Sequence, residues 1–477
     1  MPLPSISDAA QLTQRRAALS AQLAERLPER VGLILAGVSQ PRNYRGNPYP
    51  YRVSSHALYV GGQLPEGSAF VFDPQQSDAG VLFVPAEGVS DQLWHGKGPS
   101  VEEWGERLGC PAHPLSALEA HLAGRADRLV GLPQYQPQMI ARQEALMGRP
   151  YQAEPSSADV AWVRLLVEAR LTHDELALRG LREAARLTAE AHKEGLKALA
   201  QLDLSGAGVQ APRARHIKAA MEAPLTQAGA TPAYTPIVTP HGEVLHQHDH
   251  GARLEEGGLL LVDFGAELPD GGCGDVTRTW PIGGRYSPSQ AAVYEVVLGA
   301  LRAATSRVRA GTEYREVHQR ACEVLTEGLC RLGIFKVSAQ EALEANAHAL
   351  FFPHGVGHLL GLDVHDMEDL GDLAGYAEGR ARDERFGWGY LRLDRPLQVG
   401  MVVTVEPGFY QVPALLERPE LAGPHAEACV DWERLRDFSD VRGVRLEDDV
   451  LVTSGEPIVL SESIPIELRA IEALLAE

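Results

Sequence analysis

Residues 350–366 constrain this chain more than any other stretch of its sequence. They read LFFPHGVGHLLGLDVHD and carry three histidines, His354, His358 and His365, among glycines and bulky apolar side chains. Imidazole is a common neutral metal ligand that titrates near pH 7, and glycine lets a backbone or a substrate approach it closely. A lone histidine in such a setting is more often a buried group with a hydrogen-bond partner. Three together favour a functional site, provided that acidic partners occur elsewhere.

Acidic partners do occur, at the ends or in the middle of apolar, strand-like segments. They are Asp263 in the run 258–265, Asp275 in the segment GDVTRTW, Glu406 in the run 401–408 and Glu447 in the alternating segment 443–450. A buried charge is costly unless it is paired or bound to a metal. Four carboxylates and one imidazole therefore predict a shared dinuclear site, with ligands that suit Mn²⁺, Co²⁺ or Zn²⁺.

In this order and with these flanking residues, five side chains resemble the metal-binding set of the pita-bread metallopeptidases: Asp263, Asp275, His358, Glu406 and Glu447. That family includes methionine aminopeptidase, Xaa-Pro aminopeptidase and prolidase. The motif HGVGH, followed by GLDVHD and then by VEPGFY, is similar to the proline-specific branch. The resemblance is strong over residues 165–465 and weaker before them. It implies two divalent ions, Mn²⁺ first, with Co²⁺ or Zn²⁺ as alternatives.

The resemblance also implies how the ligands divide between the ions. Asp263 would bind one metal, His358 and Glu406 would bind the other, and Asp275 and Glu447 would bridge both. Two ions about 3.5–4 Å apart can bridge a water, lower its pKa and present hydroxide to the peptide carbonyl.

Three side chains would assist this reaction. Glu406 matches the carboxylate that carries the proton from water to the leaving nitrogen. His354 and His365 would donate hydrogen bonds to the substrate carbonyl and to the oxyanion. The scissile nitrogen would belong to proline, which carries no N–H in a peptide.

Two residues are assigned to substrate binding by the same resemblance. His246, in a Val-Leu-His context before Asp263, matches a histidine that lines the substrate pocket. The family usually has an aromatic residue next, whereas this chain has Gln247, which leaves the shape of the pocket open. Arg392 matches, by its distance from Glu406, an arginine near the substrate, and its planar fork suits a carboxylate or a carbonyl.

The stretch 241–250 holds three more histidines, His241, His248 and His250. Strand-like alternation would place His246, His248 and His250 on one face, where a three-histidine metal site is conceivable. Because the acidic set already accounts for the metals, we interpret these three as structural or solvent-facing.

Composition narrows the class of partner. Lys and Arg total 44 and Asp and Glu 64, a net charge of −20, which argues against nucleic acid or an anionic membrane as the main partner. The sequence has no apolar run long enough to span a membrane, and residues 12–23 read as an amphipathic helix rather than a signal peptide. Five cysteines without a Cys-x-x-Cys pair indicate reduced thiols and a cytoplasmic location. We interpret Cys273 as packing rather than ligating.

A chain of 477 residues predicts two domains. Strand-like runs at 31–37, 69–73 and 81–85 alternate with helical patterns at 102–108 and 117–122, which indicates an N-terminal α/β domain. A stretch rich in Pro, Ser and Gly at 148–159 marks the boundary. The predicted fold is thus α+β, with an N-terminal α/β domain at 1–158 and a pita-bread catalytic domain at 159–477.

Four local features of the second domain are also predicted. Thr172, with Glu175 three residues later, has the spacing of a capping box for a long helix, on which we expect His192 to lie on the polar face. Residues 371–385 are predicted to form a solvated loop, residues 411–440 a surface insertion and residues 464–477 a terminal helix.

Xaa-Pro aminopeptidase is the favoured function, with Xaa-Pro dipeptidase (prolidase) as the alternative. A creatinase-like amidinohydrolase is disfavoured because such enzymes lack the acidic set, and a metal-free binding protein because all five ligand positions hold suitable residues. The expected partners are a proline-containing peptide and further copies of the chain, since relatives are commonly dimers or tetramers. The segment 94–98 (WHGKG) resembles one that helps to close the site, often that of a neighbouring subunit.

Overall fold

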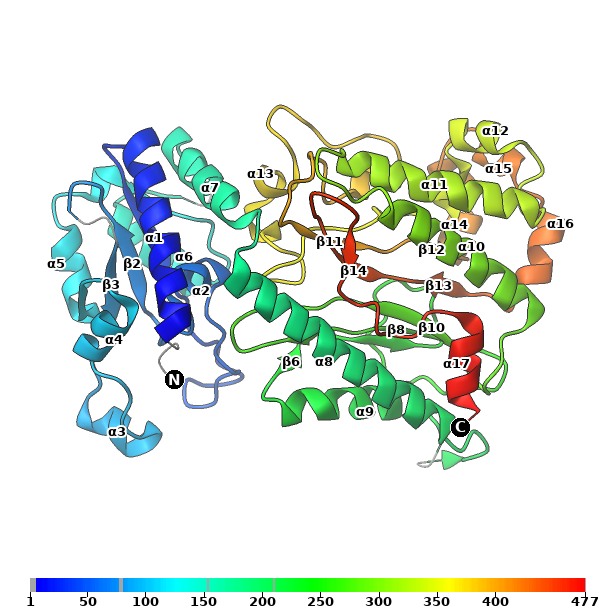
Figure 1. The fold of residues 1–477 in the computed structure, drawn as a ribbon, viewed down its shortest axis with the longest axis horizontal. Coiled ribbons are helices and arrows are strands. Elements are labelled where there is room, and N and C mark those ends of the chain that lie inside the picture. The colour runs from blue at the N-terminus through cyan, green and yellow to red at the C-terminus, as the bar shows by residue number, and fades with distance from the viewer. Residues whose placement is uncertain (1–5, 77–79, 152–153, 209–210, 477) are drawn as a thin grey trace. The chain divides into compact units, whose positions relative to one another are not determined.

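The computed structural model describes the chain except for residues 1–5, 77–79, 152–153, 209–210 and 477. The chain divides into two compact units, shown in Figure 1. Unit 1 comprises Met1–Thr172 and Met367–Ala374, and unit 2 comprises His173–Asp366 and Gly375–Glu477. Helix α7 (Ser157–Arg170) thus belongs to unit 1, and the predicted division between residues 158 and 159 stays a prediction.

Unit 1 is built on a five-stranded sheet in the order β4-β3-β2-β1-β5. The strands are β1 (Val31–Leu35), β2 (Ala69–Phe72), β3 (Val81–Val84), β4 (Ala112–Pro114) and β5 (Leu129–Val130). The helices include α1 (Ile6–Arg26), α2 (Ser55–Gly61), α4 (Val101–Leu108), α5 (Leu118–Leu122) and α6 (Pro137–Met147). The predicted strands and helices of this region are confirmed. Gly32 of β1 lets α7 pack on the sheet, because a Cβ there would lie 2.7 Å from the ring of Trp162.

Helix α3 (Val89–His95) differs from the other α-helices of unit 1 because it has no buried residue. Its apolar side chains face solvent, with exposed fractions of 88% for Val89, 74% for Leu93 and 75% for Trp94. Large apolar groups gathered at the surface in this way often mark an interaction site.

In unit 2, antiparallel strands lie between the helix pair α8 (Glu175–Ala200) and α9 (Ala214–Gln227) and the pair α10 (Pro288–Thr305) and α11 (Tyr314–Arg331) (Figure 1). One sheet has the order β10-β8-β7 (Thr277–Pro281, Leu259–Asp263, Ile237–Thr239). Another has the order β11-β14-β15 (Val402–Val405, Asp448–Leu451, Ile458–Val459), and β12 (Gly408–Tyr410) pairs with β13 (Gly443–Arg445). Two short strands, β6 (Thr231–Pro232) and β9 (Ala266–Glu267), form a further pair. Cys273 is buried with Leu181, Leu360 and Val402, which confirms its packing role.

Three local predictions were wrong. Helix α8 is capped by Asp174, whose carboxylate accepts a hydrogen bond of 2.9 Å from the Ala177 N–H, and not by Thr172. His192 is fully buried rather than on a polar face, with its Nε2 3.2 Å from the Phe264 carbonyl oxygen. Burial lowers its pKa to about 3. Residues 246–250 form a loop and not a strand, so alternation does not govern their histidines.

The two insertions are also more ordered than predicted. Residues 411–440 form the short helices α14 (Pro413–Leu416), α15 (Ala426–Cys429) and α16 (Trp432–Leu435), and they bury Val430 and Phe438, so they are not only a surface excursion. In the segment 371–385, Asp372–Gly375 forms helix α13, whereas most of the rest is exposed. The terminal helix α17 spans Leu468–Leu475 as expected. No helix in the described part of the chain is long and apolar enough to cross a membrane.

Candidate active site

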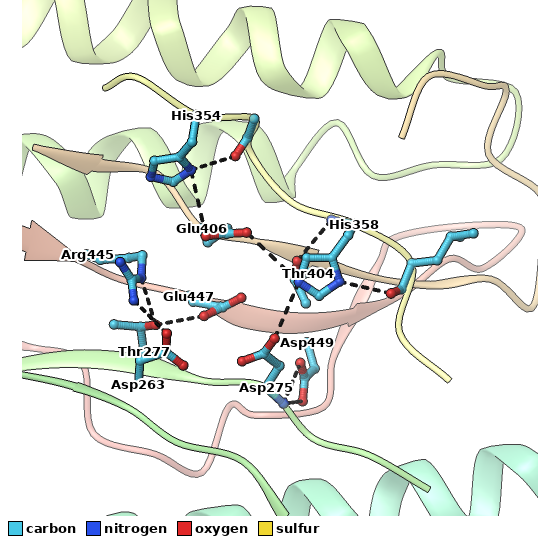
Figure 2. A network of polar contacts seen from close by, with 12 residues as sticks. Asp263, Asp275, Thr277, His354, His358, Thr404, Glu406, Arg445, Glu447 and Asp449 are labelled. Carbon is cyan, nitrogen blue, oxygen red and sulfur yellow. Dashed lines mark hydrogen bonds and ion pairs between the residues drawn. The ribbon is translucent and has the colours of Figure 1, made fainter. Parts of the chain in front are cut away.

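Two antiparallel strand pairs bring the four predicted carboxylates to one place (Figure 2). Asp263 ends β8, and its register partner is Thr277 at the start of β10, two residues after Asp275. The end of one strand meets the start of its antiparallel neighbour, so these two acids lie side by side. The antiparallel pair β11 and β14 brings the other two acids together in the same way, because Glu406 directly follows β11 and Glu447 directly precedes β14.

Threonines join these strand pairs and hold the backbone of His358. Thr277 accepts a backbone hydrogen bond of 3.0 Å from Glu447, and its hydroxyl donates to the Glu447 carboxylate at 2.7 Å. The N–H of His358 donates to the Thr404 hydroxyl at 3.1 Å, while the Thr404 N–H donates to the His358 carbonyl at 3.0 Å. The HGVGH segment is therefore fastened to β11 at its second histidine.

Asp275, His358 and Glu447 form a group that could hold a metal ion. All three are buried, and one potential ligand atom from each lies within 4.8 Å of the others. His358 Nδ1 lies 2.9 Å from the Leu359 carbonyl oxygen, so a neutral imidazole donates there and its Nε2 carries the lone pair that a metal needs. That Nε2 lies 3.4 Å from Asp275 Oδ2 and 4.0 Å from Glu406 Oε1. The donor set of carboxylates with one imidazole fits a divalent cation.

The pKa values of the four carboxyl groups also indicate a cation site. Burial raises the pKa of Asp263, Asp275, Glu406 and Glu447, and it is the largest cause at each of them. Repulsion between neighbouring carboxylates adds to the effect at Glu406, whose pKa reaches about 8, and at Glu447. A bound divalent cation would offset both the desolvation and the repulsion.

Two residues that the sequence analysis did not select are part of this cluster. Arg445, 4% exposed, donates to Asp263 Oδ2 at 2.5 Å and to the Thr277 hydroxyl at 3.1 Å. The Tyr234 hydroxyl lies 2.5 Å from Asp263 Oδ1 and 2.6 Å from Asp275 Oδ1. Arg445 could have been found from its position two residues before Glu447 on an alternating segment, whereas no pattern singles out Tyr234.

The other two histidines of the motif lie beside the cluster and outside the three-residue ligand group. His354 Nε2 lies 2.9 Å from the Tyr410 hydroxyl, and its Nδ1 lies 3.8 Å from Glu406 Oε2. Burial, reinforced by the charge of Arg445, lowers the pKa of His354 to about 3, so its imidazole is neutral. The rings of His358 and His365 meet edge to face with centroids 4.3 Å apart.

The two predicted substrate residues differ in their surroundings. His246 is exposed, and its ring lies nearly parallel to that of His248, with centroids 6.4 Å apart. Arg392 lies close enough to the carboxylates for its charge to lower the pKa of Asp275 and Glu406, although burial outweighs this effect. A guanidinium at the edge of the cluster is consistent with a substrate-binding residue.

Comparison with known proteins identifies the family. Residues 179–454 match metallopeptidase family M24, and residues 12–129 match the aminopeptidase P N-terminal domain. Xaa-Pro aminopeptidase 1 of Streptomyces coelicolor is 30% identical over 490 residues, covering 99% of this chain and 88% of that protein. The Xaa-Pro dipeptidase of Mus musculus is 33% identical over 321 residues, covering 65% of this chain and 61% of that protein.

A solved structure extends the match to the whole fold. The aminopeptidase PepP of Pseudomonas aeruginosa shares 29% identity with a TM-score of 0.78, and the alignment covers 100% of this chain and 99% of that one. These matches confirm the predicted α+β fold with a pita-bread catalytic domain. The chain belongs to metallopeptidase family M24 and carries an aminopeptidase P N-terminal domain.

Proposed function

We propose that this protein is a metal-dependent aminopeptidase that hydrolyses the bond between an N-terminal residue and a following proline. The observation that carries the proposal is the buried group Asp275, His358 and Glu447 inside a family M24 domain. The similarity to the Streptomyces coelicolor Xaa-Pro aminopeptidase spans both domains of the chain. The N-terminal domain matches the one named after aminopeptidase P, which supports the same specificity.

We propose two divalent ions, Mn²⁺ first, at this site. The ligands would be Asp263, Asp275, His358, Glu406 and Glu447, each supplying carboxylate oxygen or imidazole nitrogen. When bound, such ions activate water at neutral pH and polarise the peptide carbonyl. Arg445 and Tyr234 hold the Asp263 carboxylate from both of its oxygens, which fixes the direction from which it can bind an ion.

The remaining roles belong to residues around the cluster. We assign proton transfer to the leaving nitrogen to Glu406, because its carboxylate lies at the cluster within 4.0 Å of both His354 and His358 and a carboxylate so placed can accept and return a proton. His354 and His365 would donate hydrogen bonds to the substrate carbonyl and the developing oxyanion. His246 and Arg392 would contact the peptide substrate.

Substrate length tests this function against the dipeptidase alternative, which the similarity to the mouse enzyme keeps open over part of the chain. The purified protein with Mn²⁺ is given Xaa-Pro and Xaa-Pro-Yaa peptides and the released N-terminal residue is measured. An aminopeptidase hydrolyses Xaa-Pro-Yaa at least as well as Xaa-Pro. Brisk hydrolysis of Xaa-Pro with no activity on the tripeptide would assign the protein as a prolidase. The Asp275→Asn variant serves as the inactive control.

We also propose a homo-oligomer and a cytoplasmic location. The apolar side chains of α3, Val89, Leu93 and Trp94, are exposed in one chain and would be covered by a second copy. All five cysteines lie in the described part of the chain and none forms a disulfide, which suits a reducing compartment. Light scattering on the wild type and on Trp94→Ser tests the first point, since loss of the contact should lower the measured mass.

A further inference from the structure

The carboxyl group of Asp449 holds the backbone of a proposed metal ligand within unit 2. Asp449 lies on β14, two residues after Glu447, and is fully buried. Both of its carboxyl oxygens lie 3.2 Å from the backbone nitrogen of Asp275, whose N–H donates to them (Figure 2). Among the described residues, the Asp449 side chain makes no other hydrogen bond. This buried acid is therefore dedicated to the backbone of Asp275.

A side chain holds Asp275 because the backbone pairing between β10 and β14 ends before it. The Glu447 N–H donates to the Thr277 carbonyl at 3.0 Å, which joins the two chains at the start of β14. Beyond this point β14 pairs with β11 and β15, and the Asp449 carbonyl accepts the Leu460 N–H at 2.8 Å. The Asp449 side chain reaches Asp275 where the backbone of β14 no longer pairs with that chain.

The residue opposite Asp449 holds a second proposed ligand in the same way. Thr404 on β11 is the register partner of Asp449, and side chains of directly opposite residues lie on one face of a sheet. The Thr404 hydroxyl accepts the His358 N–H at 3.1 Å. One cross-strand pair thus supplies the acceptors for the backbone N–H groups of Asp275 and His358. The Oδ2 and Nε2 atoms of these two ligands lie 3.4 Å apart.

Metal binding is sensitive to this arrangement. Asp275 and His358 are buried, with exposed fractions of 5% and 2%. A buried N–H that loses its acceptor is costly, so the backbone would move to recover a partner. Metal sites require ligand distances within about 0.2 Å of their preferred values. A shift of either backbone would therefore weaken ion binding, even though no ligand atom had been removed.

We infer that Asp449 and Thr404 are a pair of positioning residues for the metal site: by accepting the N–H groups of Asp275 and His358, they fix these two ligands relative to each other. This inference rests on the proposed function, because it concerns the ions that we place there. Both residues act through the ligands, so neither one binds an ion or touches the substrate.

The main test compares Asp449→Leu with Asp449→Asn in calorimetric titrations of the chelator-treated proteins with Mn²⁺. Both changes remove the acidic group at similar size, and only asparagine keeps an oxygen that can accept the Asp275 N–H. Asp449→Leu should bind Mn²⁺ about ten- to a hundredfold more weakly than wild type, the range for groups that orient metal ligands. Asp449→Asn should stay within about threefold of wild type, because its amide oxygen still accepts. Equal affinities of the two variants would overturn the inference.

A second variant covers the case in which leucine at this buried position impairs folding. Thr404→Val keeps the shape of the side chain and removes the acceptor for the His358 N–H. It should weaken Mn²⁺ binding about tenfold, and wild-type affinity would contradict the role of the pair. Hydrogen exchange of the metal-free proteins gives a readout without any ion: residues 273–277 should exchange faster in Asp449→Leu than in Asp449→Asn, and equal rates would refute the positioning of Asp275.

A matched control separates positioning from loss of stability. Tyr294→Phe removes a hydrogen bond of 2.7 Å from a buried tyrosine of unit 2 to the Ile466 carbonyl and should leave Mn²⁺ affinity unchanged. A loss of affinity in this control as large as in Asp449→Leu would overturn the inference. If Mn²⁺ binding depends on Asp449 as expected but no proline peptide is hydrolysed, the proposed function fails and the positioning role stands.

Discussion

Replacing Glu406 with glutamine is expected to stabilise the metal-free protein at neutral and alkaline pH, even though it removes a proposed metal ligand. The Glu406 side chain is 17% exposed. Burial raises its pKa from 4.5 to about 8, with Arg445 opposing the shift and Asp275 and Asp263 adding to it. The folded chain then holds a proton that the unfolded chain has released, so stability falls as the pH rises from about 4.5 to about 8. At 1.36 kcal/mol per pH unit, the carboxyl group costs about 3 kcal/mol at pH 7 and about 5 kcal/mol above pH 8.

The assay is urea unfolding of chelator-treated wild type and Glu406→Gln at pH 5, 6, 7 and 8, followed by tryptophan fluorescence. The two proteins should have similar free energies of unfolding at pH 5, and the variant should be more stable by several kcal/mol at pH 8. Glu295→Gln, at an exposed position of α10, is the matched control and should follow the wild type at every pH. After Mn²⁺ is restored, the order should reverse, because ion binding stabilises the protein that keeps all its ligands.

One result would refute this reasoning. If metal-free Glu406→Gln were no more stable than wild type at pH 8, the Glu406 carboxyl group would be ionised in the fold at no cost. The conclusion that burial and the neighbouring carboxylates raise the pKa of Glu406 in the metal-free protein would then fail.

The remaining predictions concern metal content, the hydroxyl beside the cluster and substrate binding. His358→Ala should lose bound metal by elemental analysis, whereas His354→Ala should keep two ions and lose turnover; equal metal loss in both would show that the wrong imidazole was assigned. Tyr234→Phe removes the hydroxyl 2.5 Å from Asp263 Oδ1 and should weaken Mn²⁺ binding in a calorimetric titration by about tenfold, a typical effect for a group that orients a ligand; unchanged affinity would exclude that role. Arg392→Ala should slow Xaa-Pro and Xaa-Pro-Yaa hydrolysis to a similar degree, and a loss confined to the dipeptide would indicate a carboxylate contact worth about 1.5–3 kcal/mol.

The acids of the candidate site were predictable because each stands out from apolar neighbours. Asp263 ends a strand whose five residues are all buried, and a carboxylate in that place needs an explanation. Tyr234 escaped prediction because its hydroxyl reaches the cluster from a loop, where no periodicity applies, and tyrosine is ordinary in either setting. Arg445 could have been predicted in the same way as Glu447, because alternate residues of an extended segment share a face.

The errors at α8 have a similar physical origin. Thr172 and Asp174 are both good capping residues, and local preference does not choose between them. In the structure the Asp174 carboxylate accepts the Ala177 N–H at 2.9 Å, and the His173 N–H lies outside the helix and donates to the Gly400 carbonyl at 2.9 Å. The burial of His192 could have been predicted from its position in the helix. It lies four residues after Thr188 and four before Leu196, a spacing that places all three on one helix face, and both of these neighbours are buried.

The charges of the site favour two ions over one. When ionised, Asp263, Asp275, Glu406 and Glu447 carry four negative charges, and Arg445, hydrogen-bonded to Asp263, contributes one positive charge. Arg392 lies close enough to act as a second positive charge, so two negative charges remain in a place where burial already raises the pKa of each carboxyl group. One divalent ion would neutralise the cluster and leave no positive charge to stabilise the negative charge that develops on the carbonyl oxygen during peptide hydrolysis. The two ions that we propose would leave a net positive charge, and a preorganised site of opposite sign stabilises the transition state.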